Sequence, residues 1–319
     1  MMRRTVVLFA VLVLSTGLTR GRVPAQVFQG LSAPPLTGDR VPAREFPNLA
    51  SFPGAGESRA RAVIDSFPPP GTRPSGLDWD SNSGVLYHVD DDDSDGGTVY
   101  SITPDGTATL LFNVSAQTGH RHAGATGVCH VHDDSLGVDY LYVTDYEGGD
   151  DTNDIVYQFT LDGTLVDEYQ LDGIDPVCDG VMGIAFDGEH FWLSCLLIDP
   201  GRIVKCDREF AAVDTFFHPA GGSGGGMDYD RETDSLYLTE YFEGNVYVTD
   251  RTLSIKDVFP AHPVAFQMVG IAVGRVGRER TVWTSSFNPS WRYIYEIDDE
   301  YYNSPVARLS WGTIKSLYR

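Results

Sequence analysis

Five short segments of the sequence begin with a glycine followed by an apolar residue, and they recur at intervals of 51, 56, 43 and 44 residues. The segments are GLDWD at Gly76, GVCHV at Gly127, GIAFD at Gly183, GMDYD at Gly226 and GIAVG at Gly270. Similarity at a period of roughly 20–50 residues is typical of solenoids, propellers and repeat arrays. This period constrains the fold more than any other feature of the chain.

Each glycine segment is followed by three further apolar runs of about the same length. The second run is VLYHVD (85–90), YLYVTD (140–145), HFWLSC (190–195), SLYLTE (235–240) or TVWTSS (281–286). The third run includes TVYSITPDG and YIYEID, and the fourth includes ATLLFNV and VARLSW (306–311). Short runs rich in Val, Ile, Tyr, Trp and Thr, broken by Gly, Asp, Asn and Pro, predict strands. No segment keeps a helical period, so we expect few helices.

Four strands in every 45 residues or so predict the blade of a β-propeller. One blade cannot bury both of its faces, so the blades must close into a ring. We therefore expect an all-β protein with five four-stranded blades, with six blades as the alternative, in one domain at residues 60–319. The segment ARAVIDSF (60–67) either completes the last blade from the other end of the chain or belongs to a degenerate sixth blade.

The order G-[LIM]-x-[WFY]-D, then [LF]-[YW]-[VL]-[ST]-[DE], then VY-x-[IFV]-x-x-DG resembles a large group of propellers. The group contains NHL-type, SMP-30/gluconolactonase-like and YjiK (SdiA-regulated)-like proteins, and PSGLDWDSNSGVLYHVDDD is most similar to the last. The resemblance implies a propeller over residues 60–310. For gluconolactonase-like enzymes it also implies a metal held by Glu, Asn and Asp near the starts of the inner strands. The residues before the five glycines depart from that pattern: Ser75, Thr126, Met182, Gly225 and Val269.

The N-terminal sequence MMRRTVVLFAVLVLSTGLTRGRVPAQ places two arginines before an apolar run and small residues. This order predicts a secretory signal peptide at residues 1–25. A proline-rich stretch at 26–59 then forms an extended lead-in. No later stretch is long and apolar enough to predict a membrane span. We expect a secreted monomer, extracellular or periplasmic.

The net charge of −22 limits the partners of the chain. Such an acidic protein repels nucleic acids and anionic membranes, and it suits divalent cations. We therefore expect a small-molecule, glycan or protein ligand rather than a nucleic acid.

The four cysteines can form disulfides if the chain is exported. Cys195 and Cys206 lie symmetrically about Pro200-Gly201 in SCLLIDPGRIVKC, which predicts that they pair across a hairpin. Cys129 and Cys178 would then pair by elimination. Buried free thiols are the alternative for each pair.

Alternating strand direction places the loops between the outer strand of one blade and the inner strand of the next (D–A loops) on one face of the ring. The loops between the second and third strands (B–C loops) lie on the same face, where propellers usually bind ligands. Three acids end the second runs at the same repeat position: Asp90, Asp145 and Glu240. Four histidines fall in the D–A loops: His120, His122, His218 and His262.

The B–C loop of the first blade, in HVDDDDSDGGTVY, matches the first half of an EF-hand at Asp91, Asp93 and Asp95 before Gly96. Calcium takes six to eight oxygen ligands, so another loop must complete the set, because the EF-hand glutamate position is Ile102. We therefore predict Ca²⁺, or another divalent metal, bound by these residues with Asp90, Asp145 and Glu240. The alternative is a hydrated acidic turn.

The histidines permit two roles, as ligands of a transition metal or as a general base. The sequence thus favours a ligand-binding module with a calcium-type cation on the B–C loop face. The alternative is a metal-assisted, lactonase-like hydrolase or lyase whose site lies at the mouth of the channel. A purely structural surface protein is a third hypothesis.

Overall fold

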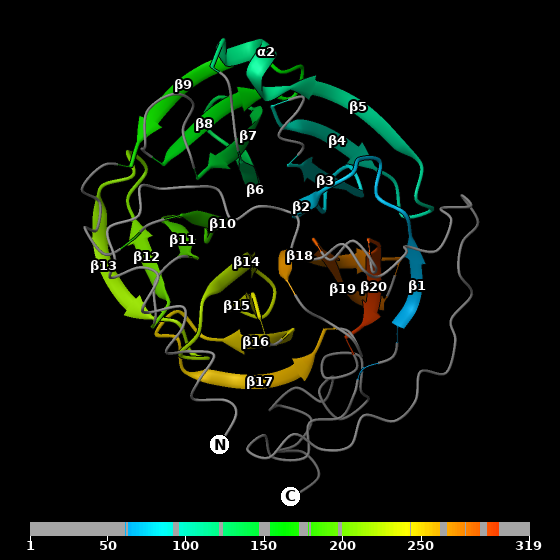
Figure 1. Ribbon diagram of the computed structural model, residues 1–319, viewed down its shortest axis with the longest axis vertical. Helices are drawn as coiled ribbons and strands as arrows, with labels where there is room; N and C mark the ends of the chain where they lie inside the picture. Colours follow the sequence, from blue (N-terminus) through cyan, green and yellow to red (C-terminus); the bar gives the residue numbers. More distant parts are fainter. Residues whose placement is uncertain are drawn as a thin grey trace, which may run out of the picture. The chain divides into compact units, whose positions relative to one another are not determined.

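Five antiparallel sheets of four strands each surround a common axis (Figure 1). The computed structural model describes residue 61 and residues 63–299, except 92–95, 121–123, 147–153, 172–177, 179, 197–199, 243, 262–266, 278 and 288–291. All of them belong to the unit Leu36–Arg319. The predicted fold class, an all-β propeller with five blades, is confirmed. The predicted signal peptide and lead-in lie outside the described residues.

The strands of each blade follow one another from the axis outward. Blade 1 contains β2 (Pro74–Asp80), β3 (Val85–Asp90), β4 (Thr98–Ile102) and β5 (Ala108–Asn113). Blade 2 contains β6 (Ala125–Asp133), β7 (Val138–Asp145), β8 (Ile155–Thr160) and β9 (Leu165–Gln170). Blade 3 contains β10 (Val181–Phe186), β11 (Phe191–Cys195), β12 (Arg202–Cys206) and β13 (Ala212–Phe217). Blade 4 contains β14 (Gly224–Asp230), β15 (Ser235–Glu240), β16 (Asn245–Thr249) and β17 (Ile255–Pro260). Blade 5 contains β18 (Met268–Val276), β19 (Glu279–Ser286), β20 (Ile294–Asp298) and β1 (Val63–Phe67).

The last blade is completed by the first strand of the described chain. Strand β1 pairs antiparallel with β20, with Phe67 opposite Ile294. ARAVIDSF therefore closes the ring, which decides between the two alternatives for that segment. The outer position that the sequence assigned to VARLSW is taken by β1, and residues 306–311 lie outside the described part of the chain.

Buried ion pairs hold this closure. Arg61, just before β1, pairs with Asp299, just after β20, and also with Asp257 of blade 4 at 2.5 Å. The Arg61 guanidinium lies 3.6 Å from the centre of the Phe259 ring. Arg280 Nε donates to Asp299 Oδ2 at 2.9 Å. The network links the two ends of the ring through residues 238 positions apart in the sequence.

The repeated glycines form a closed ring around the axis. A Cβ added at Gly76 would lie 2.7 Å from the carbonyl oxygen of Thr126 in blade 2, and one at Gly127 would lie 3.0 Å from the carbonyl oxygen of Met182 in blade 3. The same close approach follows from blade to blade until Gly270 meets Ser75 of blade 1. Each inner strand thus touches the backbone of the next, and only glycine leaves room for this contact. The cavity that these strands line at the axis is too narrow to hold a water molecule.

Aromatic side chains fill the boundaries between blades. Trp79 of blade 1 stacks on Trp283 of blade 5, with ring centroids 4.5 Å apart. Phe191 and Phe210 of blade 3 stack in the same way at 4.5 Å, beside Tyr142 of blade 2. These contacts bury large apolar areas, which is the main source of stability in a ring of sheets.

The disulfide joins Cys178 to Cys195, so the predicted pairs Cys195–Cys206 and Cys129–Cys178 are wrong. In the β11–β12 register Cys195 faces Arg202, and Cys206 faces Phe191. The hairpin turn therefore falls two residues before the assumed centre, and the two cysteines lie at opposite ends of the strand pair. Cys129 and Cys206 are buried free thiols, which was the alternative.

Helices are few, as predicted: the described part of the chain holds one, α2 (Val114–Thr118). Asn113 caps it by accepting a hydrogen bond from the Ala116 N–H. Within the residues that the structure describes, no helix has the length and apolar character needed to cross a membrane.

Candidate functional site

The D–A and B–C loops meet at five equivalent points around the ring. The residue after each second strand donates its backbone N–H to a carbonyl of the same blade's D–A loop, at 2.8–3.1 Å. The five pairs are Asp91 to Arg73, Tyr146 to Gly124, Leu196 to Gly180, Tyr241 to Ser223 and Phe287 to Gln267. These bonds give the face a regular backbone frame and leave five side chains that differ: one acid, two tyrosines, a leucine and a phenylalanine.

Side chains of blades 1, 4 and 5 gather on this face in a group that we call the mouth cluster: Arg73, Asp91, Tyr241, Gln267 and Phe287. Arg73 pairs with Asp91 at 3.4 Å, and its guanidinium lies 5.2 Å from the centre of the Phe287 ring. The Tyr241 side chain forms a hydrogen bond with Gln267. It also interacts electrostatically with the charges of Arg73 and Asp91. Burial raises the pKa of Tyr241, and the Arg73 charge partly offsets this effect. The cluster therefore combines a half-buried cation with aromatic surface, a combination common in binding sites.

The predicted acids at the ends of the second strands are buried, and Asp90 and Glu240 lie against their own D–A loops. Asp90 accepts a hydrogen bond from the Arg73 N–H at 2.8 Å. Glu240 lies against Gly222, where an added Cβ would be 2.6 Å from Oε1. Asp145 is fully buried at the end of β7. The repeat position of these acids was predicted correctly, but their side chains are buried rather than on an open surface.

The predicted calcium loop lies only partly within the described residues. Asp91 is described and buried, whereas Asp93 and Asp95 lie outside the described residues. Among the described residues, no three His, Cys, Asp or Glu side chains are grouped so that they could hold a metal ion. Asp90, Asp145 and Glu240 thus do not form a metal centre by themselves, and a calcium site here requires Asp93 and Asp95.

The structure separates the two D–A histidines that it describes. His120 is exposed on the outer side of the ring, with Nε2 3.4 Å from Glu168 of β9 in blade 2. His218 is buried against the edge of Tyr247 in blade 4. Its Nδ1 accepts the Ala220 N–H at 3.2 Å, and burial lowers its pKa to about 4, so the ring is neutral. His122 and His262 lie outside the described residues.

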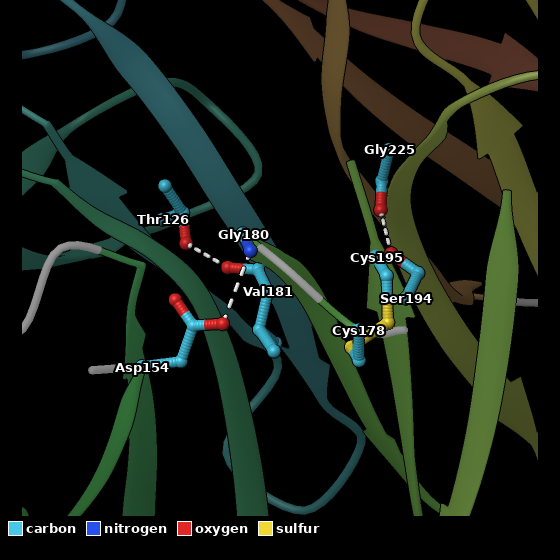
Figure 2. Close-up of a disulfide and its surroundings, with 8 residues drawn as sticks. All are labelled: Thr126, Asp154, Cys178, Gly180, Val181, Ser194, Cys195 and Gly225. Atoms are coloured by element: carbon cyan, nitrogen blue, oxygen red, sulfur yellow. Dashed lines mark hydrogen bonds between the residues drawn. A yellow bond between two sulfur atoms is a disulfide. The ribbon is translucent and has the colours of Figure 1, made fainter. Parts of the chain in front are cut away.

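The disulfide fixes the D–A loop of blade 3 to the end of β11 (Figure 2). In the same region, Asp154 accepts the Gly180 N–H at 3.0 Å, and Thr126 Oγ1 donates to the Val181 carbonyl at 2.8 Å. Cys195 occupies the repeat position of Asp90, Asp145 and Glu240. A covalent bond in blade 3 therefore stands where buried acids stand in three other blades.

The sequence interpretation missed a group of carboxyls farther along the axis. Asp78 and Asp228 are the third residues of GLDWD and GMDYD, and both are buried. They hydrogen-bond each other, although they belong to blades 1 and 4. Comparing the third position across the five glycine segments could have found them, because the other three residues there are Cys129, Ala185 and Ala272.

No protein-family profile matches the sequence, and no curated protein sequence matches it significantly. Among solved structures, glutaminyl cyclase from Myxococcus xanthus is similar in fold, with a TM-score of 0.52 at 14% identity over 75% of this chain and 96% of that chain. A streptogramin B lyase has a TM-score of 0.43 at 13% identity over 73% and 96% of the two chains. A protein from Agrobacterium tumefaciens described as the calcium-binding protein regucalcin has a TM-score of 0.45 at 14% identity over 75% and 93%.

Fold and comparisons together define the class of the chain: it is a five-bladed β-propeller. The resemblance to the propeller group is thus confirmed at the level of the fold, and the YjiK-like subgroup stays a prediction. At these identities the likeness concerns architecture and transfers no activity.

Proposed function

We propose that the protein is a secreted ligand-binding propeller whose ligand docks at the mouth cluster. The observation that carries the proposal is the convergence of Arg73, Tyr241 and Phe287 from three blades on the D–A and B–C loop face. Because the glycine ring closes the axis below them, a ligand would lie across the mouth rather than enter the channel.

The chemistry of the mouth cluster suggests the kind of ligand. The Arg73 side chain is 35% exposed, and Asp91 orients it from one side. The rings of Tyr241 and Phe287 offer apolar faces beside the guanidinium. A small molecule, glycan or protein segment with an oxygen acceptor next to an apolar face would satisfy both groups.

A calcium-type cation is the second part of the proposal. Asp91 belongs to the mouth cluster, and Asp93 and Asp95 follow it in the same B–C loop. A cation bound by this loop would lower the repulsion among its carboxylates and hold the edge of the mouth. The acidic character of the chain supports this choice, since it raises the local concentration of divalent cations.

Calorimetric titration of the mature chain with calcium tests the cation, combined with melting curves in EDTA and in excess calcium. We expect one site that raises the melting temperature and is lost in Asp93→Asn. Asp167→Asn, an exposed acid on the outer strand β9, is the matched control and should bind calcium normally. Absence of heat and of any thermal shift would reduce the loop to a hydrated acidic turn.

Anilinonaphthalene sulfonate is a suitable probe of the mouth, because it carries an aromatic face next to an anionic acceptor. We expect Arg73→Gln and Tyr241→Ala to weaken its binding. Arg202→Gln is the matched control, since Arg202 lies 3.9 Å over the exposed Phe217 on the outer side of blade 3. Equal loss in the control and in the mouth variants would argue against a binding mouth.

A further inference from the structure

The third residues of the five glycine segments occupy equivalent places on the inner strands β2, β6, β10, β14 and β18. In order they are Asp78, Cys129, Ala185, Asp228 and Ala272. Two carboxyls, a thiol and two alanines therefore share one level of the axis, two residues along each inner strand from the glycine ring. All five side chains are buried.

The two carboxyls connect four of the five blades. Asp78 in blade 1 accepts the backbone N–H of His130 in blade 2. Asp228 in blade 4 accepts the backbone N–H of Val273 in blade 5 at 2.6 Å. Because the carboxyls also bond each other across the axis, blades 1, 2, 4 and 5 are joined through one pair of side chains.

A bond between two carboxyl groups requires a proton between them. Each carboxyl already uses both oxygens as acceptors, since Oδ1 of Asp78 accepts the Trp79 N–H and Oδ1 of Asp228 accepts the Tyr229 N–H. Two buried carboxylates in contact would repel each other strongly if both were charged. One hydrogen must therefore come from a carboxyl itself, as in other carboxyl pairs that share a proton.

We propose that a proton shared by Asp78 and Asp228 links the blades at the axis. The propeller should therefore be most stable against unfolding in acid and become less stable as the pH rises. The device is separate from the mouth cluster and needs no ligand.

The pKa values of the pair agree with this geometry in direction. Burial, followed by the charge of Asp228, raises the pKa of Asp78 well above its usual range. Burial raises the pKa of Asp228 to about 7. A raised carboxyl pKa in the folded state means that the native chain binds more protons than the unfolded chain above pH 4 or so. Stability from this pair is therefore complete below that pH and is lost as the pH rises through the folded pKa values.

Four other titratable or charged groups lie in the electrostatic surroundings of the pair. Cys129 of β6 lies near both carboxyls, and burial, followed by the charge of Asp78, raises the pKa of its thiol. Asp230 acts on Asp228, Arg231 acts on the same thiol, and Tyr87 feels the charge of Asp78. The inner strands β10 and β18 contribute only alanines at this level. Arg231 is the one cation among these described contacts, and it acts on the thiol rather than on either carboxyl.

Thermal melts of the intact chain between about pH 6.5 and pH 8, above the range in which the His218 contribution to stability changes, test the proposal. The wild type should lose melting temperature as the pH rises, and Asp228→Asn should remove at least half of that slope. The Asn amide supplies the hydrogen that the proton supplied, although it gives up one accepted N–H, so the readout is the slope and not the absolute melting temperature. A slope in Asp228→Asn equal to that of the wild type would overturn the proposal.

Two controls separate the pair from other groups. Asp187 is a buried aspartate of blade 3 whose pKa is lowered because hydrogen bonds from the His190 N–H, Trp192 and the Glu189 N–H outweigh burial. Asp187→Asn should therefore leave the slope above pH 5 unchanged. His132 has a pKa raised by its hydrogen bond to Asp139 and titrates in the same direction as the pair. His132→Asn measures how much His132 contributes to the pH slope of the melting temperature. This contribution must be smaller than the effect of Asp228→Asn.

Infrared difference spectra of the wild type provide a second readout that does not depend on how well the variants fold. The carbonyl stretch of a protonated carboxyl should be present at neutral pH and disappear in alkali before global unfolding. Its absence at neutral pH would also overturn the proposal.

Discussion

The two ends of the propeller axis have the same backbone arrangement but carry different functional side chains. On the D–A and B–C loop side of the glycine ring lie the mouth cluster and the neutral, buried His218. Beyond the ring, toward the opposite face, lie the Asp78–Asp228 pair and the ion pairs of Arg280. The glycines that separate the two regions are equivalent in all five blades. The comparison shows that repetition in this chain fixes the ring, whereas single departures from the repeat determine what each end can do.

Arg280→Ala should produce the largest loss of stability, because it leaves buried carboxylates at the far end without their cation. Arg280 is 2% exposed and pairs with Asp230 and Asp299, and Asp299 is fully buried. Removing one partner of a buried pair costs about 3–5 kcal/mol. Urea unfolding measures the loss. Arg275→Ala is the matched control, since Arg275 pairs with Glu232 but is 44% exposed, and it should cost less than about 1 kcal/mol. Similar losses in both variants would mean that the far end is no more sensitive than the surface.

Gly226→Val should cause the second largest loss of stability, because it places a side chain in the glycine ring between the two ends. A Cβ at this position would lie 2.6 Å from the Val269 carbonyl oxygen and 2.9 Å from Gly270 Cα. Two backbones must then move apart, at a cost of about 3 kcal/mol or more. Gly84→Asn is the control, because Gly84 has a φ of 69° and open space around it, and Asn tolerates that conformation. Calorimetric melts should show a large decrease only for Gly226→Val.

Loss of the disulfide should weaken the mouth end by a similar or slightly smaller amount. Cys178 and Cys195 close a loop across 17 residues, and a bridge over such a loop contributes about 3 kcal/mol in the chain-entropy model. The double variant Cys178→Ser/Cys195→Ser should match the reduced wild type in urea unfolding. If the reduced wild type kept its full stability, the bridge would not hold this end of the ring.

The last prediction concerns the pH response of the mouth end, which should have the opposite sign to that of the carboxyl pair. Burial lowers the pKa of His218 to about 4, so the unfolded chain binds the extra proton as the pH falls below about 6.5. Stability from the neutral ring is therefore full above that pH and is lost by about 1.4 kcal/mol per pH unit toward pH 4. His218→Gln should flatten this acid limb of the stability curve. His120→Gln, at an exposed histidine, should leave it unchanged.

The fold could be predicted because the repeated glycines respond to a local physical demand. Each inner strand touches the next, so the residue at that contact has no room for a side chain, and the sequence records this five times. The positions of Asp90, Asp145 and Glu240 followed from the same repeat. The role of ARAVIDSF could be narrowed to two alternatives, and the pairing of β1 with β20 decided between them.

The sites were harder to predict, because repeat position says which loop a residue belongs to but not which way its side chain points. His120 and His218 lie in equivalent loops, yet one is exposed beside Glu168 and the other is buried beside Tyr247. A hairpin centre misplaced by two residues was enough to assign the wrong partner to Cys195. The repeat motif leaves the position of Asp78 and Asp228 variable, since their contact across the axis joins segments about 150 positions apart and leaves no local pattern.

The closure of blade 5 has a consequence for folding during synthesis on the ribosome. A ribosome makes β1 before any other strand of the ring, and β20 after all of them. Until β20 emerges, β1 has no partner, and the first and fifth blades present unfinished faces to chaperones and to other nascent chains. Translation that stops before Asp299 would thus release an open arc rather than a shorter ring. The residues made first and last in the ring, Arg61 and Asp299, are joined by an ion pair that can form only when synthesis has passed through the whole circle.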